Sequence, residues 1–257
     1  MPLKIYLIGR SHMDFDNLNR FLLEHDITWK RTDGAAQGEE MVEVAGRVCY
    51  MSFDHNQKQS NEAFIRHLIK KGHESILEHV TWTFLLIGIS RALTHQIVRH
   101  RVGFAFSQLS QQYYDQTDAE FLKPPILENF PNASSAWDEL VEVAKKSYKN
   151  ILRELAELEN PVKNGISKKE IRRLIRSAAR SVLPNSTETK IVMTANARAI
   201  RHLLAVRGSI PGDEEMRTVC GELLTILKAE APALFMDFEL RSLADGSPIV
   251  FKKKMEN

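Results

Sequence analysis

Hydrophobic residues recur at three- and four-residue intervals over much of the chain, which is the period of an amphipathic helix. One such segment is predicted over residues 38–50, and its stripe consists of Met41, Val44, Ala45 and Val48. A second predicted helix begins after Ser60, a favourable N-cap residue, and stops at Gly72, since glycine commonly ends helices. Residues 4–8 and 80–87 are rich in β-branched and aromatic residues instead, so we expect strands there.

The pattern continues through the second half of the chain. Further helices are predicted over residues 91–101, about 135–155, 168–182, 197–207 and 213–231, and a strand over 190–194. Their candidate caps are Ser90, Ser134 or Ser135, Ser167 and Asn196. A polar loop is predicted from about residue 102 to residue 125. We therefore expect the α+β class, with a single mainly helical domain over residues 1–257 and a small, mostly antiparallel sheet.

The composition is that of an ordinary soluble globular protein, because 43% of the 257 residues are hydrophobic and 26% are charged. The longest apolar run, around residues 83–89, is too short for a membrane span, and the N-terminus lacks the layout of a signal peptide. Cys49 and Cys220 each fall on the apolar stripe of a predicted helix, so neither is expected to be a nucleophile. We expect a cytoplasmic protein with no membrane partner.

Charge is distributed unevenly, although the net charge is only +2. Residues 161–210 contain eleven basic and two acidic side chains, which indicates an anionic ligand or, more commonly, a solvated basic face. Arg91, His95 and Arg99 are spaced four residues apart and would share one helix face. Either a bound anion or the helix dipole would offset their mutual repulsion. A nucleic-acid partner is not expected, because no aromatic residues interleave the arginines of the predicted helix 168–182.

Several standard catalytic patterns are absent from the sequence. It contains no glycine-rich dinucleotide motif, no P-loop and no Gly-x-Ser-x-Gly elbow. His73 and His79 are six positions apart, which would place them on different faces of a helix. A zinc site is therefore not expected.

Five ordered blocks nevertheless resemble those of the flavin-dependent thymidylate synthases. They are residues 72–79, 89–96, 99–110, 180–184 and 196–207. The third block, Arg99-His100-Arg101 followed by Ser110, is similar to the family's R-H-R…S signature. The first block, GHESILEH, resembles its G-H-x-S-x-x-E-H motif. The resemblance covers roughly residues 3–240, and five blocks in order are far more specific than one.

The resemblance implies the family's α+β fold and a homotetramer whose active sites lie between subunits. It implies reductive methylation of dUMP at C5 to give dTMP, with methylenetetrahydrofolate as the carbon donor. NADPH would reduce FAD, bound tightly or exchangeably, and the reduced flavin would deliver a hydride. This route needs no cysteine nucleophile, but it needs cations for the phosphates and for a uracil ring that gains negative charge.

The resemblance also implies roles for individual residues. The substrate would be bound by Gln96, Arg99, Gln108, Ser110, Gln111, Gln112, Arg180 and Arg207. The cofactor would be bound by Ser75, Arg99, His100, Arg101, Gln108, Asn196, Arg198 and His202. Arg207 would be the catalytic residue, because its guanidinium would polarise the uracil and favour ionisation at N3. No metal ion is implied.

One position departs from the family pattern. After Ser110 the family usually has x-Arg-Tyr, whose arginine holds the dUMP phosphate, but this chain has Gln112 in place of the arginine. A neutral amide binds phosphate more weakly than a guanidinium. Another cation, such as Arg172 or Arg176, could compensate. Alternatively, the chain could be a UMP C5-methylase of nucleoside biosynthesis, or a flavin- or nucleotide-binding homologue without catalysis.

Overall fold

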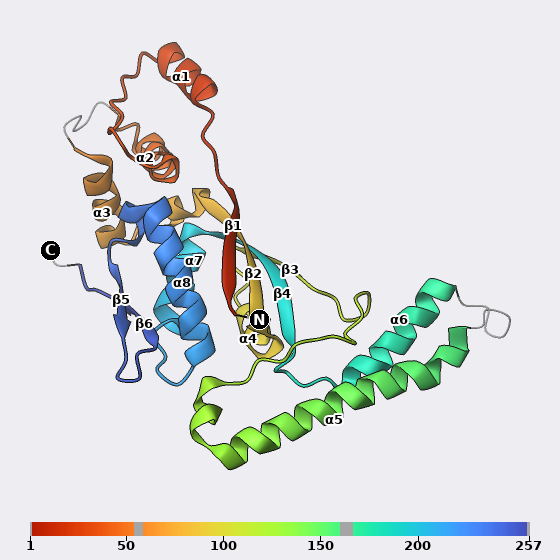
Figure 1. Ribbon diagram of the computed structural model, residues 1–257. Coiled ribbons are helices and arrows are strands. Elements are labelled where there is room, and N and C mark those ends of the chain that lie inside the picture. The colour runs from red at the N-terminus through yellow and green to blue at the C-terminus, as the bar shows by residue number, and fades with distance from the viewer. Residues whose placement is uncertain (1, 54–58, 160–166, 256–257) are drawn as a thin grey trace. The chain divides into compact units, whose positions relative to one another are not determined.

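The computed structural model describes residues 2–53, 59–159 and 167–255, and these have the mainly helical α+β composition predicted from the sequence (Figure 1). The helices are α1 (Phe15–Glu24), α2 (Gln37–Tyr50), α3 (Asn61–Lys71), α4 (Arg91–Ile97), α5 (Pro131–Leu155), α6 (Lys168–Ala179), α7 (Ala197–Arg207) and α8 (Glu214–Glu230). The strands are β1 (Lys4–Arg10), β2 (Thr81–Ser90), β3 (Phe104–Gln108), β4 (Glu188–Asn196), β5 (Phe238–Ser242) and β6 (Pro248–Lys252).

The internal contacts of the chain divide it into two compact units. Unit 1 contains the described residues within 1–4, 86–99 and 107–191, and unit 2 contains those within 5–85, 100–106 and 192–257. Among the described residues, one sheet has the strand order β1-β2-β4-β3, and β5 and β6 form a separate antiparallel pair. The chain passes from one unit into the other within β1, β2, β3 and β4, and between Arg99 and His100.

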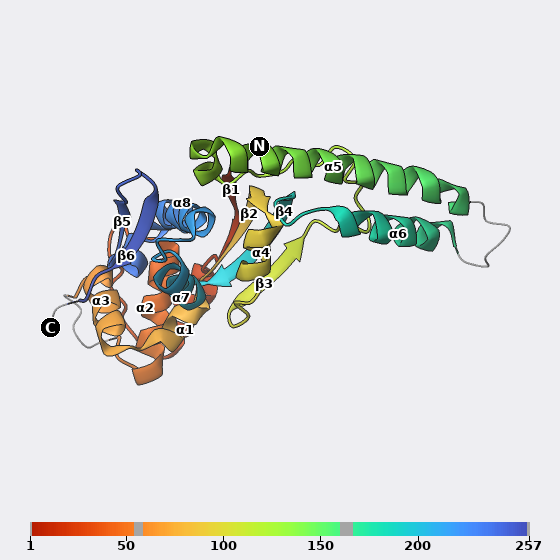
Figure 2. The same ribbon diagram turned by 90° about the horizontal axis from the view of Figure 1, so that it is seen from below.

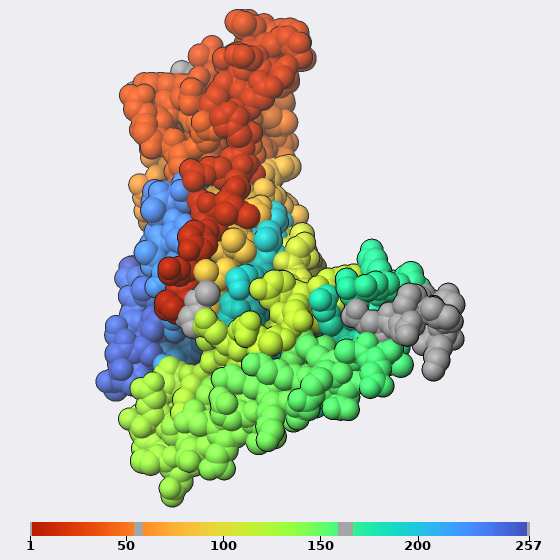
Figure 3. Space-filling view, turned by 45° about the vertical axis from the view of Figure 1, so that its right-hand side comes forward, coloured from red at the N-terminus to blue at the C-terminus, as the bar shows by residue number. Residues whose placement is uncertain are grey.

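In unit 1, α5 and α6 lie side by side (Figures 1 and 2). The predicted long helix is confirmed, but it begins at Pro131, because proline is well suited to a first turn. Ser134 and Ser135 therefore lie inside the helix, and their predicted role as caps is wrong. The buried side of α5 includes Tyr148, whose hydroxyl accepts a hydrogen bond from the Gln116 N–H at 3.0 Å. The outer side of α5 is exposed to solvent and forms the green ridge in Figure 3.

The other predicted caps are confirmed. The cap side chain accepts a hydrogen bond from the N–H three residues further on in each case: Ser60 from Ala63, Ser90 from Leu93, Ser167 from Glu170 and Asn196 from Ala199. Gly72 ends α3 with a φ of 72°, a left-handed conformation that glycine adopts without strain. These local interactions explain why the helix boundaries agree with the sequence pattern.

The core of unit 2 includes the inner faces of α7 and α8. Its fully buried side chains include Phe84, Met193, Leu203, Leu204, Val219, Leu223, Phe235 and Phe238. Arg201 of α7 forms a buried ion pair with Asp237, with Nη1–Oδ1 and Nη2–Oδ2 distances of 2.6 and 2.7 Å. This two-point contact fixes the inner side of α7, while Arg198 and His202 remain exposed.

The apolar stripe predicted for α2 is wrong, although the helix itself is present. The helix buries Glu39, Glu40, Glu43 and Arg47 and leaves Val48 exposed. Arginines compensate two of these carboxylates: Glu43 lies 2.7 Å from Arg47, and Glu40 lies 2.7 Å from Arg31. Glu39 instead accepts hydrogen bonds from the N–H groups of Ala36 and Ala233, and burial raises its pKa. The inner face of α2 therefore consists mainly of charged residues with satisfied partners, together with the buried Val42.

The helix predicted over residues 91–101 is shorter in the structure, because α4 ends four residues earlier. Arg99 therefore lies outside the helix and does not share a helix face with Arg91 and His95, so that prediction is wrong. The strand β3 occupies part of the loop predicted over residues 102–125. Neither α1 nor the β5–β6 pair has a counterpart in the sequence prediction.

Candidate functional site

In unit 1, three of the predicted substrate residues form the turn that follows β3. The Ser110 hydroxyl accepts a hydrogen bond from the Gln112 N–H at 3.3 Å, and the Ser110 carbonyl accepts one from the Tyr114 N–H at 2.9 Å. Between them, Gln111 is only 6% exposed, and its Nε2 has no hydrogen-bond partner among the described residues. A buried donor without a partner is costly, so this amide indicates an acceptor that a ligand would supply.

The side chain of Gln112 connects this turn to α6. Its Oε1 accepts a hydrogen bond from Arg173 Nε at 3.2 Å, and its Nε2 donates one to Ser177 Oγ at 3.0 Å. Arg176 donates to the backbone carbonyl of Tyr113 at 2.6 Å. Part of the basic face of α6 is therefore engaged with the turn rather than only with solvent.

Arg91 lies beside the same turn, and the charge of Arg180 acts on it. Arg91 Nη1 lies 3.5 Å from the carbonyl oxygen of Leu109, and burial, followed by the charge of Arg180, lowers the pKa of Arg91. Neither guanidinium has an ion-pair partner within the described ranges. Two like charges repel each other unless an anion offsets them, so this pair is suited to a phosphate. Gln96 is half-buried in the last turn of α4, and Arg99 follows it with an exposed side chain.

Gln108 is held by two buried threonines of unit 1. Its Nε2 donates to Thr94 Oγ1 at 2.9 Å and to Thr189 Oγ1 at 3.3 Å. Thr94 Oγ1 donates its own proton to the Arg91 carbonyl at 3.0 Å, so toward Gln108 it can only accept. The amide nitrogen of Gln108 must therefore face the threonines, which leaves its Oε1 free to accept a hydrogen bond. The sequence motifs do not identify Thr94 or Thr189 as partners of Gln108.

In unit 2, the predicted cofactor residues lie at α7, in the segment before β3 and, for Ser75, in the short helix Glu74–His79. The Asn196 N–H donates to the Gly103 carbonyl at 3.1 Å. Gly103 has a φ of +73°, and a Cβ at this position would lie 2.7 Å from Asn196 Nδ2, so the close approach requires glycine. The His100 and His202 rings are 6.1 Å apart, edge to face. The turn at Gly103 therefore brings His100 and Arg101 close to α7.

Arg207 is the last residue of α7. Its Nη2 lies 3.3 Å from Asp213 Oδ2, and its side chain is 25% exposed. Its Nε is buried and has no hydrogen-bond partner in the described part of the chain. The guanidinium is thus partly neutralised by one carboxylate and keeps an unused donor, which suits a ligand oxygen that carries or gains negative charge.

Arg198 is exposed on α7 and bonds two carboxylates that the motifs do not identify as its partners. Its Nη1 lies 2.5 Å from Glu78 Oε1, and its Nε lies 3.5 Å from Glu74 Oε2. The hydrogen bond that Arg198 donates to Glu78 is the main cause that raises the pKa of Arg198. Ser75 lies in the same turn as these glutamates and is exposed, as is Arg101. Glu78 precedes Arg198 by 120 positions, so no local signal in the sequence could have revealed the pair.

The imidazole of His100 is expected to make stability depend on pH. Burial, followed by the charges of His202 and Arg207, lowers its pKa below the ordinary value of 6.5. The folded protein then binds fewer protons than the unfolded chain, so the contribution of His100 to stability is present above pH 6.5 and is lost as the pH falls through the lower, folded-state pKa.

Urea unfolding of the parent and of His100→Gln between pH 7.5 and pH 5.5 tests this expectation. The parent should lose more free energy of unfolding over this interval than the variant does. Equal losses in the two proteins would show that His100 does not carry the effect.

Neither cysteine lies among these residues. Burial raises the pKa of Cys220 to about 12, so its thiol stays protonated at neutral pH. Cys49 is exposed, and its predicted place on an apolar stripe is wrong. Over the ranges described, no group of three or more His, Cys, Asp or Glu side chains could hold a metal ion. No helix in those ranges is both long and apolar enough to cross a membrane.

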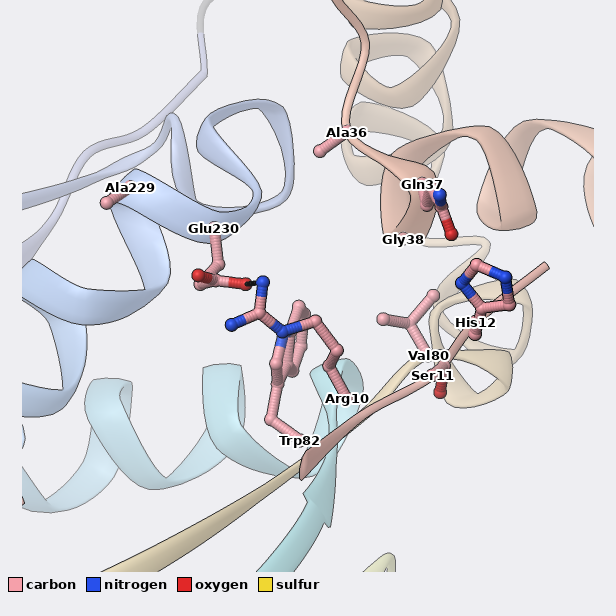
Figure 4. Close-up of a pocket in the computed structure, with 10 residues that line it drawn as sticks. All are labelled: Arg10, Ser11, His12, Ala36, Gln37, Gly38, Val80, Trp82, Ala229 and Glu230. Carbon is pink, nitrogen blue, oxygen red and sulfur yellow. Dashed lines mark ion pairs between the residues drawn. The ribbon is translucent and has the colours of Figure 1, made fainter. Parts of the chain in front are cut away.

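A separate cavity of about 460 Å³ lies in unit 2. It is lined by Arg10, Ser11, His12, Ala36, Gln37, Gly38, Val80, Trp82, Ala229 and Glu230, none of which the motifs single out. Figure 4 shows Arg10 directed at Glu230, with which it forms an ion pair at 3.1 Å. Because this arginine is already paired, the cavity is less suited to an anion than the arginines of unit 1.

Comparison with known proteins identifies the family. Residues 32–233 match the Thy1 family model, described as thymidylate synthase complementing protein. The chain is 39% identical over 250 residues to the flavin-dependent thymidylate synthases of Mycobacterium tuberculosis and Mycobacterium marinum, with 96% of this chain and 94% of each relative covered. It is 38% identical over 259 residues to that of Mycobacteroides abscessus, with 98% of both chains covered. The chain therefore belongs to the family of flavin-dependent thymidylate synthases, as its motifs predict.

Proposed function

We propose that this chain is a thymidylate synthase that methylates dUMP at C5 to give dTMP, with methylenetetrahydrofolate as the carbon donor. Membership of the family supports the reaction. The observation that carries the nucleotide substrate is the turn after β3. The buried Gln111 amide there has no partner among the described residues, and the guanidinium groups of Arg91 and Arg173 lie beside it. Such a set of donors suits an anionic nucleotide.

On the substrate side, the residues of unit 1 would bind and orient the nucleotide. Ser110 and the turn that follows it would bind the phosphate, with Arg180 as a cation. Gln96 and Arg99 would contact the nucleotide as the resemblance implies. Gln108 would offer its Oε1 to a donor of the substrate or cofactor, because its nitrogen is committed to Thr94.

The residues of unit 2 fit a flavin. His202 and Arg101 are exposed, and the His202 ring lies 6.1 Å from that of His100. Arg198 is also exposed on α7, where Glu74 and Glu78 hold its guanidinium. We propose that the flavin is FAD and that it is held by Ser75, His100, Arg101, Asn196, Arg198 and His202. When bound and reduced by NADPH, it would supply the hydride that completes the methyl group.

Arg207 is proposed to act on the uracil ring. A guanidinium stays charged at every working pH and can donate two parallel bonds to a carbonyl that gains negative charge. His100 is kept mostly neutral at pH 7 by its lowered pKa, so one ring nitrogen can donate while the other accepts. We also propose a single domain over residues 1–257 and a cytoplasmic location, as the sequence predicts. From the resemblance, we propose a homotetramer with active sites completed by neighbouring subunits.

Release of tritium from C5-labelled dUMP, in the presence of FAD, NADPH and methylenetetrahydrofolate, tests the function. Labelled UMP is the parallel substrate. Release from dUMP is expected. Release from UMP alone would make the chain a ribonucleotide methylase, and no release from either by a protein that binds flavin would show a homologue without catalysis.

The threonine contact of Gln108 gives a further expectation. Thr94→Val keeps the shape of the side chain but removes the acceptor, so the Gln108 amide loses its fixed orientation. We expect kcat/KM for dUMP to fall about tenfold, the effect of one well-placed hydrogen bond. Thr189→Val should have a smaller effect, because its contact is longer at 3.3 Å. A Thr94→Val enzyme with unchanged kcat/KM and an unchanged melting temperature would contradict this role.

A further inference from the structure

Gln112 makes a contact that an arginine at the same position could not make. Its Oε1 accepts a hydrogen bond from Arg173 while its Nε2 donates one to Ser177, one helical turn further along α6. A glutamine side chain has both an acceptor and donors, whereas a guanidinium only donates. An arginine at position 112 would repel Arg173 instead of holding it.

The positive charge of Arg173 is held close to the turn and is only weakly neutralised. Its acidic neighbour, Glu170, lies 3.6 Å away, and both side chains are nearly half exposed. Exposed pairs of this kind contribute little. Its guanidinium also lies 5.6 Å from the centre of the Tyr113 ring, in the same turn. Most of its charge is therefore available to an anion.

The turn after β3 also contains a hydrogen-bond donor that has no acceptor among the described residues. Gln111 is buried, and its Nε2 has no hydrogen-bond partner among the described residues. This orphan donor, in the residue next to Gln112, is an independent sign that a ligand oxygen belongs here.

We infer that Arg173, positioned by Gln112, binds the 5′-phosphate of the nucleotide in this chain and replaces the arginine that the family usually has at position 112. The inference rests on the proposed function, because it takes the substrate to be a nucleoside monophosphate. The positive charge that binds the phosphate is thus supplied by α6 rather than by the turn, and Gln112 acts as a positioning residue for Arg173.

Equilibrium dialysis of the FAD-loaded protein with labelled dUMP and labelled deoxyuridine tests the inference. Arg173→Gln should weaken dUMP binding about tenfold or more, the loss of one charge-assisted bond, and should leave deoxyuridine binding unchanged. Gln112→Ala should weaken dUMP binding by a smaller factor. Lys169→Gln is the matched control, because it removes the same charge from an exposed position of α6 and should change neither affinity.

The double variant Arg173→Gln, Gln112→Arg returns the cation to the turn and should recover most of the affinity for dUMP. The inference is overturned if Arg173→Gln binds dUMP as the parent does, or if it weakens both ligands equally, as a merely structural residue would. A parent that binds dUMP but releases no tritium would contradict the proposed function and leave this result intact. A parent that binds no dUMP would overturn both.

Discussion

Arg207→Ala is expected to lower turnover of dUMP by at least about 10²–10³-fold while FAD stays bound, since removal of one donor to a developing negative charge has effects of this size. Arg207 fits such a role because its buried Nε has no hydrogen-bond partner among the residues that the structure describes, and Asp213 pairs with Nη2 alone in that part of the chain. Arg207→Lys keeps the charge but loses the planar fork, so it should restore only part of the rate.

The measurement is tritium release together with flavin absorbance of the purified protein. Arg66→Ala is a suitable control, because Arg66 is an exposed arginine of α3 in the same unit and pairs with the exposed Glu62. Equal methylation rates in Arg207→Ala and the parent would exclude the catalytic role. Loss of FAD together with turnover would instead make Arg207 a cofactor-binding residue.

Helix boundaries could largely be predicted from the sequence, because caps depend on neighbouring residues alone. The structure confirms the predicted caps Ser60, Ser90, Ser167 and Asn196. The inner face of α2 could not be predicted in this way. Glu43 is buried because Arg47 pairs with it and Asn61 of α3 donates to it at 2.8 Å. Such tertiary contacts override hydrophobic periodicity.

The candidate site shows the same difference between local features, which the sequence predicts, and tertiary contacts, which it does not. Its motif residues could be identified from the sequence by resemblance, but their partners could not. Gln112 and Arg173 are 61 positions apart, and their contact depends on how α6 lies against the turn. The sequence does contain the departure from the family pattern at position 112. Only the structure indicates that Arg173, rather than Arg172 or Arg176, contacts the substituted residue.

The buried pair Arg201–Asp237 is expected to stabilise the fold and, through it, the flavin side of the site. Both side chains are at most 4% exposed, and Arg201 also donates to the Leu234 carbonyl. Arg201 lies on the same helix as His202 and Arg207, so the pair fixes the helix that carries them. Asp237→Ala would leave a buried guanidinium without its counter-charge, at an expected cost of about 3–5 kcal/mol.

A loss of this size is a large part of the free energy of unfolding of an ordinary protein, about 5–15 kcal/mol. Urea unfolding of Asp237→Ala should therefore show a midpoint far below that of the parent. Arg201→Met with Asp237→Leu removes both charges and should recover most of the loss, because the penalty comes from the unpaired charge rather than from the missing attraction. A double variant as unstable as Asp237→Ala would contradict that explanation. A single variant within about 1 kcal/mol of the parent, the size of an exposed pair, would show that the ion pair does not hold α7.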